Sequence, residues 1–329
     1  MNDNVISTRV RLARNFHGVR FPAKMSDVDA DGIIKTVKSA LGNGYEIYYA
    51  ARTSEADAGA LMERHLISPE LLRSRRGAAI TDGESVSVMA CEEDHIRIQA
   101  IVGGFDPAGA YDMAKAIDDK IRKRAEYAYS DRLGYLTACP SNLGCGMRLS
   151  VMSFLPALNK SGKMEEAVAI LSETGITVRG EKGEGSRGAG YAFQISNRRS
   201  LGVNEKEIIA SVSDAAKLLW NMEAEERKRL LSTRRNALKD EVFRALGTLD
   251  HAYMISHEEL TALCGEVKFG IDCGFLRGMT TTEIDELCAR FQPYNLMLEK
   301  GRPMNKEERA LVRAALIPSA LTKLNEVRQ

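Results

Sequence analysis

Two strand-like segments, Ser85-Val-Ser-Val-Met-Ala90 and His95-Ile-Arg-Ile-Gln-Ala-Ile101, are separated only by Cys91-Glu-Glu-Asp94. β-Branched and alternating side chains are typical of strands, and so short an interruption leaves room only for a turn. The sequence therefore predicts an antiparallel hairpin with an acidic turn. Further strands are predicted at residues 45–50, 175–179 and 191–196.

Helix-start signals flank these strands and fill the last third of the chain. Asp106-Pro107 is typical of an N-cap followed by proline at the first helical position, and predicts a helix to about Arg124. Residues 204–207 and 256–259 have capping-box spacing before apolar periodicity. We predict an α+β fold with an antiparallel sheet flanked by helices, a catalytic domain over residues 1–225 and a helical C-terminal domain over 226–329, with a soft boundary within 203–240.

The composition argues against several classes of partner. The chain has 329 residues, 44% of them hydrophobic, and Lys+Arg 46 against Asp+Glu 45 gives a net charge of +1. Nothing global attracts nucleic acid or an anionic membrane, so a phosphate site must be a local cluster. The six cysteines form no C-x-x-C pair, and no apolar leader or spanning segment stands out. We expect a cytoplasmic protein with free thiols and no metal site made of protein ligands.

Familiar nucleotide motifs do not account for the chain. No G-x-x-x-x-G-K-[ST] occurs, which excludes a P-loop. Gly183-Glu-Gly185-Ser-Arg-Gly188 satisfies G-x-G-x-x-G but precedes a strand-like segment instead of opening a helix. We interpret it as a glycine-rich loop beside a site.

Arginines recur on or beside the strand-like segments: Arg9, Arg11, Arg97, Arg148 and Arg179. Residues two apart on a strand point the same way, and guanidinium groups bind phosphate oxygens in bidentate fashion. Any one of these residues alone would be read as a solvated arginine or a surface ion pair. The whole set predicts a triphosphate site.

Carboxylates occur in the same segments, at Glu92-Glu93-Asp94 and at Glu184. An acidic turn is usually only a solvated turn. However, a guanidinium acceptor needs carboxylates to orient it and take its proton, while a phosphoryl donor needs positive charge and Mg²⁺. Both kinds of residue are present and interleaved.

Five segments resemble the signature blocks of the ATP:guanido phosphotransferases, or phosphagen kinases. These are STRVRLARN (7–15), EEDHIR (92–97), CPSNLGCGMR (139–148), VRGEKGEG (178–185) and ISN with LG (195–202). HLISPEL (65–71) and the FGIDCGF and RALVRAAL stretches are similar to the bacterial branch that phosphorylates arginine in proteins. The likeness spans nearly the whole chain, in order.

The resemblance implies a role for each matching residue. The five arginines and His65 would hold ATP, Glu93 and Glu184 would position and deprotonate the guanidinium, and Cys139 would be the reactive cysteine beside the acceptor. Mg²⁺ would be held by phosphates and water. The implied nucleotide-contacting set is Ser7, Thr8, Arg9, Val10, Arg11, His65, Arg97, Arg148, Leu149, Ser150, Val151, Met152, Arg179, Gly180, Glu181, Lys182, Gly183 and Glu184.

The resemblance also bears on the acceptor and the partners. Small-molecule members carry a helical domain before the STRVR block, whereas only six residues precede Ser7 here. The C-terminal third resembles a part linked to dimerisation and phosphoarginine binding. Its Arg-Asp-x-x-Arg-Ala motif stands here as Arg309-Ala310-Leu-Val-Arg313-Ala314. Arg309 and Arg313 are therefore candidate phosphate ligands, but without the aspartate.

Two further departures are small. Cys91 stands where asparagine is usual, and Cys145 where threonine is common. We therefore predict a cytoplasmic, homodimeric protein arginine kinase that uses ATP and Mg²⁺ and acts in regulated degradation or stress response, with a Clp-type AAA+ protease and a zinc-finger activator as partners. The alternatives are a small-guanidine phosphagen kinase and a non-catalytic nucleotide- or phosphoarginine-binding adaptor.

Overall fold

The computed structural model describes residues 4–180, 183–184 and 189–327. Its centre is a nine-stranded antiparallel sheet with strand order β10-β9-β11-β8-β1-β5-β4-β3-β2. The strands are β1 (Val5–Arg14), β2 (Glu46–Tyr49), β3 (Ala78–Thr81), β4 (Val86–Ala90), β5 (Ile96–Gly103), β8 (Met147–Phe154), β9 (Ile176–Gly180), β10 (Gly183–Glu184) and β11 (Ala192–Asn197). Two small pairs lie outside it, β6 (Tyr129–Ser130) with β7 (Gly134–Tyr135) and β12 (Leu276–Arg277) with β13 (Asn325–Glu326).

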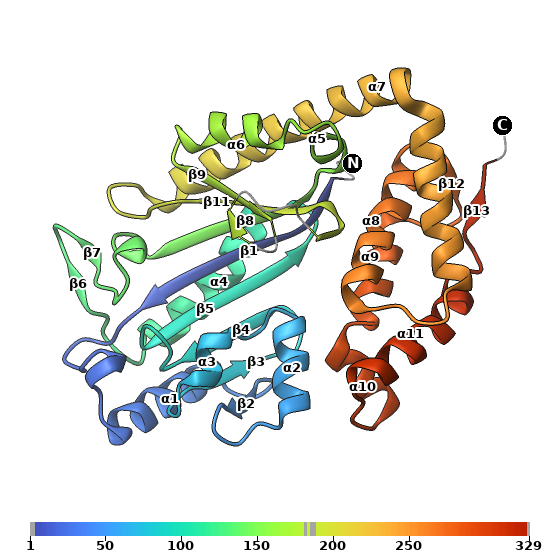
Figure 1. Ribbon diagram of the computed structural model, residues 1–329. Helices are drawn as coiled ribbons and strands as arrows, with labels where there is room; N and C mark the ends of the chain where they lie inside the picture. The colour runs from blue at the N-terminus through green and yellow to red at the C-terminus, as the bar shows by residue number, and fades with distance from the viewer. Residues whose placement is uncertain (1–3, 181–182, 185–188, 328–329) are drawn as a thin grey trace.

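The helices fall into two groups. Those before and within the sheet are α1 (Asp27–Leu41), α2 (Glu55–Glu63), α3 (Pro69–Arg73), α4 (Pro107–Arg122), α5 (Pro156–Lys160) and α6 (Met164–Ser172), with short 3₁₀ turns η1 (Pro22–Lys24), η2 (Pro140–Asn142) and η3 (Ala189–Tyr191). Those after it are α7 (Glu205–His251), α8 (His257–Asp272), α9 (Thr281–Arg290), α10 (Pro293–Lys300) and α11 (Lys306–Ala320). The α+β class predicted from the sequence is confirmed (Figure 1).

The predicted hairpin is β4 and β5, which pair antiparallel from Val86 opposite Ala100 to Ala90 opposite Ile96. The other predicted strands correspond to β2, β9 and β11, displaced by no more than one residue at either end. The predicted capping boxes are also present, at Asn204 for α7 and Ser256 for α8. Sequence reasoning missed β3, a wholly buried four-residue strand without polar alternation.

One face of the sheet forms the larger core. Val10 and Leu12 of β1, with Leu149 of β8, point into it and pack with apolar side chains of α1, α4 and the first half of α7. Figure 1 shows α4 behind β1 and β5. Because side chains alternate along a strand, the residues between these apolar ones point to the opposite face.

The second core is helical and shares α7 with the first. Leu219 and Trp220 of α7 belong to the sheet core, whereas Leu238 and Val242 pack with α8, α9 and α11. The helix has 47 residues and departs from helical φ and ψ at Arg234. The predicted boundary at residues 225 and 226 thus falls inside one helix, and it stays a prediction.

All six cysteines are free thiols. Within the described ranges, no helix combines the length and apolar character that crossing a bilayer requires.

The C-terminal helices also contact the sheet domain directly, through α10 and α2. The Glu63 carboxylate at the end of α2 accepts hydrogen bonds from the backbone N–H groups of Tyr294 and Asn295, both 2.8 Å. A carboxylate at a helix N-terminus satisfies backbone donors that lack intrahelical partners. Gly59 faces the Tyr294 ring so closely that a Cβ there would lie 2.2 Å from Cγ.

The substitution Gly59→Ala tests this contact. We expect it to lower the free energy of unfolding by about 1–3 kcal/mol, because the added methyl group must displace the Tyr294 ring and pull α10 from α2. Gly32→Ala in α1 is the matched control, since a Cβ there meets nothing within 4 Å. That variant should be up to about 1 kcal/mol more stable than the parent. Urea unfolding followed by circular dichroism measures both, and equal stability of Gly59→Ala and parent would contradict the packing.

Candidate active site

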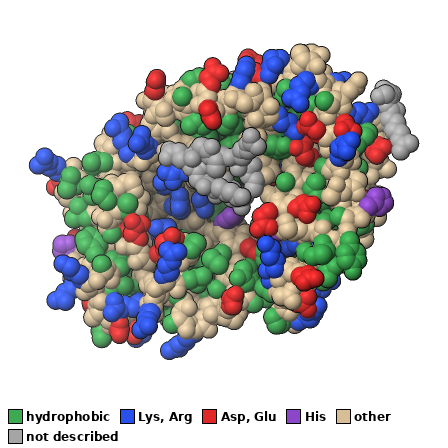
Figure 2. Space-filling view, viewed as in Figure 1, with side chains coloured by type: hydrophobic (Ala, Val, Ile, Leu, Met, Phe, Trp, Pro, Cys, Tyr) green, Lys and Arg blue, Asp and Glu red, His purple; other side chains and the backbone are tan. Residues whose placement is uncertain are grey.

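Four strands place the five predicted arginines on the sheet face opposite the core. Arg9 and Arg11 lie on β1, Arg97 on β5, Arg148 on β8 and Arg179 on β9. Arg11 stands directly opposite Arg148, and Arg97 opposite Ala13 two residues further along β1. Figure 2 shows Lys and Arg side chains gathered in a hollow near the centre of this face.

Burial and the charges of neighbouring guanidinium groups lower the pKa values of Arg9, Arg11 and Arg148. Burial, followed by the charges of Arg148 and Arg97, lowers the pKa of Arg9 to about 10. Burial, followed by the charges of Arg9, Arg148 and Arg97, lowers the pKa of Arg11. Burial and then Arg179 lower the pKa of Arg148. These residues therefore share one electrostatic environment, which favours an anion.

Neutral acceptors hold this cluster in place. Arg9 Nη2 donates to Gln194 Oε1 at 2.9 Å, and Arg148 Nη2 donates to Ser196 Oγ at 3.0 Å, both from β11. Within the described residues, Arg9, Arg11 and Arg148 form no ion pair, and the Nε atoms of Arg11 and Arg148 are buried without an acceptor. The cluster is thus ordered without being neutralised.

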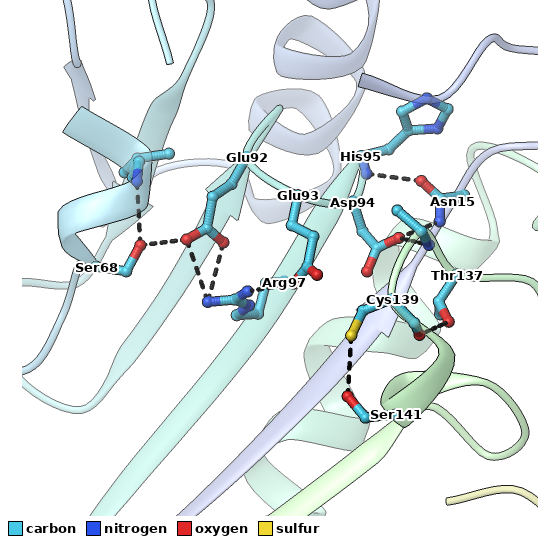
Figure 3. A network of polar contacts seen from close by, with 12 residues as sticks. Asn15, Ser68, Glu92, Glu93, Asp94, His95, Arg97, Thr137, Cys139 and Ser141 are labelled. Atoms are coloured by element: carbon cyan, nitrogen blue, oxygen red, sulfur yellow. Dashed lines mark hydrogen bonds and ion pairs between the residues drawn. The ribbon is translucent and has the colours of Figure 1, made fainter. Parts of the chain in front are cut away.

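The acidic turn contacts Arg97 of the cluster, and Figure 3 shows Glu92 and Glu93 beside this arginine. Arg97 Nη1 lies 3.0 Å from Glu92 Oε2, and Arg97 Nη2 lies 3.1 Å from Glu93 Oε2. The Glu92 side chain is 2% exposed and also accepts a hydrogen bond from Ser68 Oγ, whereas Glu93 is 40% exposed. Burial raises the pKa of Glu92, against the opposing effects of Arg97 and Ser68. Glu93 is the carboxylate that faces solvent.

Asp94 ties the same turn to the segment that carries Cys139. Its Oδ1 accepts from Asn15 Nδ2 and from the Ala138 backbone N–H, both at 2.6 Å. The Cys139 thiol contacts Ser141 Oγ at 3.0 Å. Glu93 and Cys139 are therefore held relative to each other through Asp94 (Figure 3).

His95 closes the turn on the other side. Its Nδ1 accepts from the Phe16 backbone N–H at 2.9 Å, and its Nε2 lies 2.7 Å from the Arg20 carbonyl oxygen. The first contact requires Nδ1 to be unprotonated and the second is satisfied by Nε2–H. Burial lowers the pKa of His95, in agreement with a neutral ring.

His65 lies near Arg9 of the cluster, two residues after the end of α2. Its backbone is left-handed, with φ of 60°, and its carbonyl accepts a hydrogen bond from Gln99 of β5. Desolvation and the charge of Arg9 lower its pKa. The ring therefore adds a neutral, polar group beside the guanidinium cluster at neutral pH.

Comparisons with known proteins agree with this arrangement. Residues 32–226 match the family model "ATP:guanido phosphotransferase, C-terminal catalytic domain", and residues 235–329 match "Protein-arginine kinase McsB C-terminal domain". A protein-arginine kinase of Bacillus pumilus is 38% identical over 97% of this chain and 90% of its own length. One of Bacillus subtilis is 37% identical over 100% of this chain and 93% of its own length.

The chain belongs to the ATP:guanido phosphotransferase family.

Solved structures of similar fold are kinases of the same kind. Lombricine kinase has a TM-score of 0.60 and 25% identity, over 68% of this chain and 67% of its own. The duplicated taurocyamine kinase from Schistosoma mansoni, with bound components of a transition state analog, has a TM-score of 0.60 and 27% identity, over 68% of this chain and 34% of its own. This guanido phosphotransferase is accordingly a kinase.

Several other predicted nucleotide contacts of this guanido phosphotransferase have buried side chains. The side chains of Thr8, Val10, Leu149, Ser150 and Val151 are buried, and Val10, Leu149 and Val151 belong to the sheet core. Ser7 and Met152 are partly exposed and stand opposite each other, and Gly180 ends β9. For the apolar three, only backbone atoms remain for a ligand.

Part of the glycine-rich segment lies outside the described residues. Glu181, Lys182 and the side chain of Glu184 are outside the described part of the chain. The backbone of Gly183 and Glu184 forms β10, where Glu184 is opposite Arg179. The predicted role of the Glu184 carboxylate, to position and deprotonate the guanidinium together with Glu93, therefore stays a prediction.

Arg309 and Arg313 have structural partners in this guanido phosphotransferase. Arg313 is 2% exposed and donates to the carbonyl oxygens of Phe291 and Ile255 at 2.9 and 2.8 Å. Arg309 donates to the Met304 carbonyl at 2.6 Å. Both arginines line a hollow together with His257. Phosphate binding in this hollow stays a prediction.

Sequence reasoning missed the residues that brace the site. Ser68, Gln194 and Asn15 act through contacts between segments far apart in the chain, and Glu92 and Asp94 were noted only as part of an acidic turn. Asn15 does end a recognised block, and its position directly after the arginine strand was the available signal.

The substitution Arg11→Gln tests the charge cluster. We expect the ligand-free variant to be more stable than the parent by about 1 kcal/mol, because a repelling buried charge is removed, and to lose the stabilisation that tripolyphosphate gives the parent. Arg244→Gln, which removes an exposed arginine paired with Asp240, should change stability by less than about 0.5 kcal/mol and keep the response. Thermal unfolding with and without tripolyphosphate measures this, and a destabilised Arg11→Gln would contradict it.

The His95 contacts predict a dependence on pH. Because the folded chain holds the neutral ring, the unfolded chain takes up the proton first as pH falls below the ordinary value of 6.5. The free energy of unfolding should then decrease by up to about 1.4 kcal/mol per pH unit from this residue. In His95→Gln the slope of the free energy of unfolding against pH should be smaller by the contribution of one proton. His251 has a side chain that is 81% exposed, and His251→Gln should have the same slope as the parent. Urea unfolding between about pH 5 and 7.5 measures the slopes, and equal slopes in His95→Gln and parent would refute the assignment.

Proposed function

We propose that the chain is a protein arginine kinase, which transfers the γ-phosphoryl group of ATP to arginine side chains of other proteins. The observation that carries the proposal is the match of residues 235–329 to a domain model named for protein-arginine kinase. Relatives with that name are 36–38% identical over nearly the whole chain. The arginine cluster beside an exposed carboxylate supports the chemistry.

The arginine cluster would bind the triphosphate. Within the described residues, Arg9, Arg11 and Arg148 offer donors without a carboxylate partner, and Arg97 stands where the cluster meets the acidic turn. Phosphoryl transfer requires mainly positioning and stabilisation of charge on the phosphoryl oxygens. His65 would line the same site.

Glu93 would act on the acceptor. Its exposed carboxylate orients the guanidinium and accepts a proton from the attacking nitrogen as the N–P bond forms and the bond from phosphorus to the bridging β,γ-oxygen breaks. ADP leaves with that oxygen. Glu184 would supply the second carboxylate, and Cys139 would lie beside the acceptor without carrying the phosphoryl group.

Mg²⁺ would neutralise charge on the phosphates when bound with ATP. The residues described here include no group of three or more His, Cys, Asp or Glu side chains arranged to hold a metal ion. We expect the ion to be held chiefly by phosphate oxygens and water, its usual mode in kinases.

The wider biological role follows from the family resemblance alone. On that ground we propose that the protein is a cytoplasmic homodimer with a Clp-type AAA+ protease and a zinc-finger activator as partners. It would act in regulated degradation or stress response. A non-catalytic adaptor is disfavoured by the retention of Glu93 and of all five arginines on one face.

The substitution Glu93→Gln tests the catalytic assignment. We expect arginine phosphorylation to fall by about 10²- to 10⁴-fold, because the amide cannot accept the proton, while ATP still raises the thermal stability. Glu165→Gln, at an exposed position on α6, should phosphorylate as the parent does. The measurement is phosphosite mass spectrometry of a protein mixture and of free arginine, treated with chain and ATP under acid-free conditions.

The same measurement separates the alternatives. Phosphoarginine in proteins supports the protein kinase, phosphorylation of free arginine alone supports a small-guanidine kinase, and nucleotide binding without any transfer supports an adaptor. A Glu93→Gln variant as fast as the parent would exclude the role given to that carboxylate.

A further inference from the structure

A groove is lined by residues of α1 and of the acidic turn. It has a volume of about 1110 Å³, and its lining includes Glu93 and Ala138, the residue before Cys139. Clefts that enclose a drug-sized ligand typically measure about 300–1,000 Å³. The groove therefore has more room than a single small guanidino compound would fill.

The lining combines apolar and polar side chains. Met25, Ala30 and Ile34, from α1 and the turn before it, contribute buried apolar surface. Tyr49 at the end of β2 is 40% exposed and has the Arg52 guanidinium 5.7 Å from its ring centre. A lining of both apolar and polar side chains suits an extended polypeptide segment, whose backbone and side chains alternate in character.

The charges along the groove are unequal. Asp27 pairs with Arg76, and Glu92 is committed to Arg97. Among the described residues, Lys35, Arg52 and Arg75 line the groove, are exposed and form no ion pair, against Asp31 as the one acidic lining residue that is likewise unpaired away from the turn. Positive charge therefore predominates away from Glu93, and negative charge lies at Glu93.

We propose that this groove binds the polypeptide segment around the target arginine and selects segments with acidic residues near that arginine. The inference rests on the proposed function and adds a substrate class to it. The target guanidinium lies at Glu93, while Lys35, Arg52 and Arg75 attract carboxylates two to four positions away, about 7–14 Å along an extended chain.

The test compares two peptides of equal length with a single arginine. One carries glutamate at two to four positions on both sides of the arginine, and the other carries glutamine there. We expect the ratio of their kcat/KM values to favour the acidic peptide by about 3- to 10-fold at low salt, and to decrease as added NaCl screens the charges.

Variants locate the origin of the preference. In the double variant Arg52→Gln with Arg75→Gln the ratio should approach one, and because both peptides are measured on the same variant, any change in folding or chemistry cancels. The control is Arg122→Gln with Arg132→Gln, exposed arginines that border a different hollow beside β6 and β7. This control should keep the preference of the parent.

Each alternative outcome is distinct. Equal kcat/KM for the two peptides, or a preference that survives in the Arg52 and Arg75 double variant, overturns the groove assignment while leaving arginine phosphorylation intact. Phosphorylation of free arginine with neither peptide accepted overturns the proposed function and the groove assignment together.

Discussion

The constraint on which the site depends is the gathering of like charges on one face of the sheet. Guanidinium groups from β1, β5, β8 and β9 share that face, and burial followed by neighbouring guanidinium charges lowers the pKa of Arg9, Arg11 and Arg148, an arrangement that disfavours folding unless other contacts offset it. The offset comes from the opposite face, where Val10, Leu12 and Leu149 are wholly buried. The same strands thus supply the apolar contacts that stabilise the fold and the charges that destabilise it. A bound anion would reduce the repulsion between these charges.

The helical part is connected to this site through two routes. One is α7, whose first half covers the sheet core and whose second half belongs to the helical core. The other is the contact of Glu63 and Gly59 with α10, which fixes the end of α2 two residues before His65. Because α7 and the contact between α2 and α10 both join the two parts, the packing of the C-terminal helices bears on the geometry of the site.

The sequence allowed prediction of what is local. The β4–β5 hairpin, the caps at Asp106 and Asn204, and the common face of Arg9 and Arg11 follow from periodicity and spacing within a few residues. The strand β3 was missed because four buried residues show no alternation. The brace between Arg9 and Gln194 joins residues 185 positions apart, and no local pattern encodes which neutral acceptor will face a given arginine.

Arg97 connects the two chemistries of the site, and the exposure of its partners decides how. Among the five arginines it is the one with carboxylate partners in the described structure, Glu92 and Glu93. Breaking a buried pair is strongly unfavourable, about 3–5 kcal/mol, whereas an exposed pair contributes only about 0–1 kcal/mol. An anion that competes for Arg97 therefore displaces Glu93, 40% exposed, long before Glu92, 2% exposed. The geometry thus holds Arg97 in place through Glu92 and leaves Glu93 available to a second cation, the guanidinium of an acceptor.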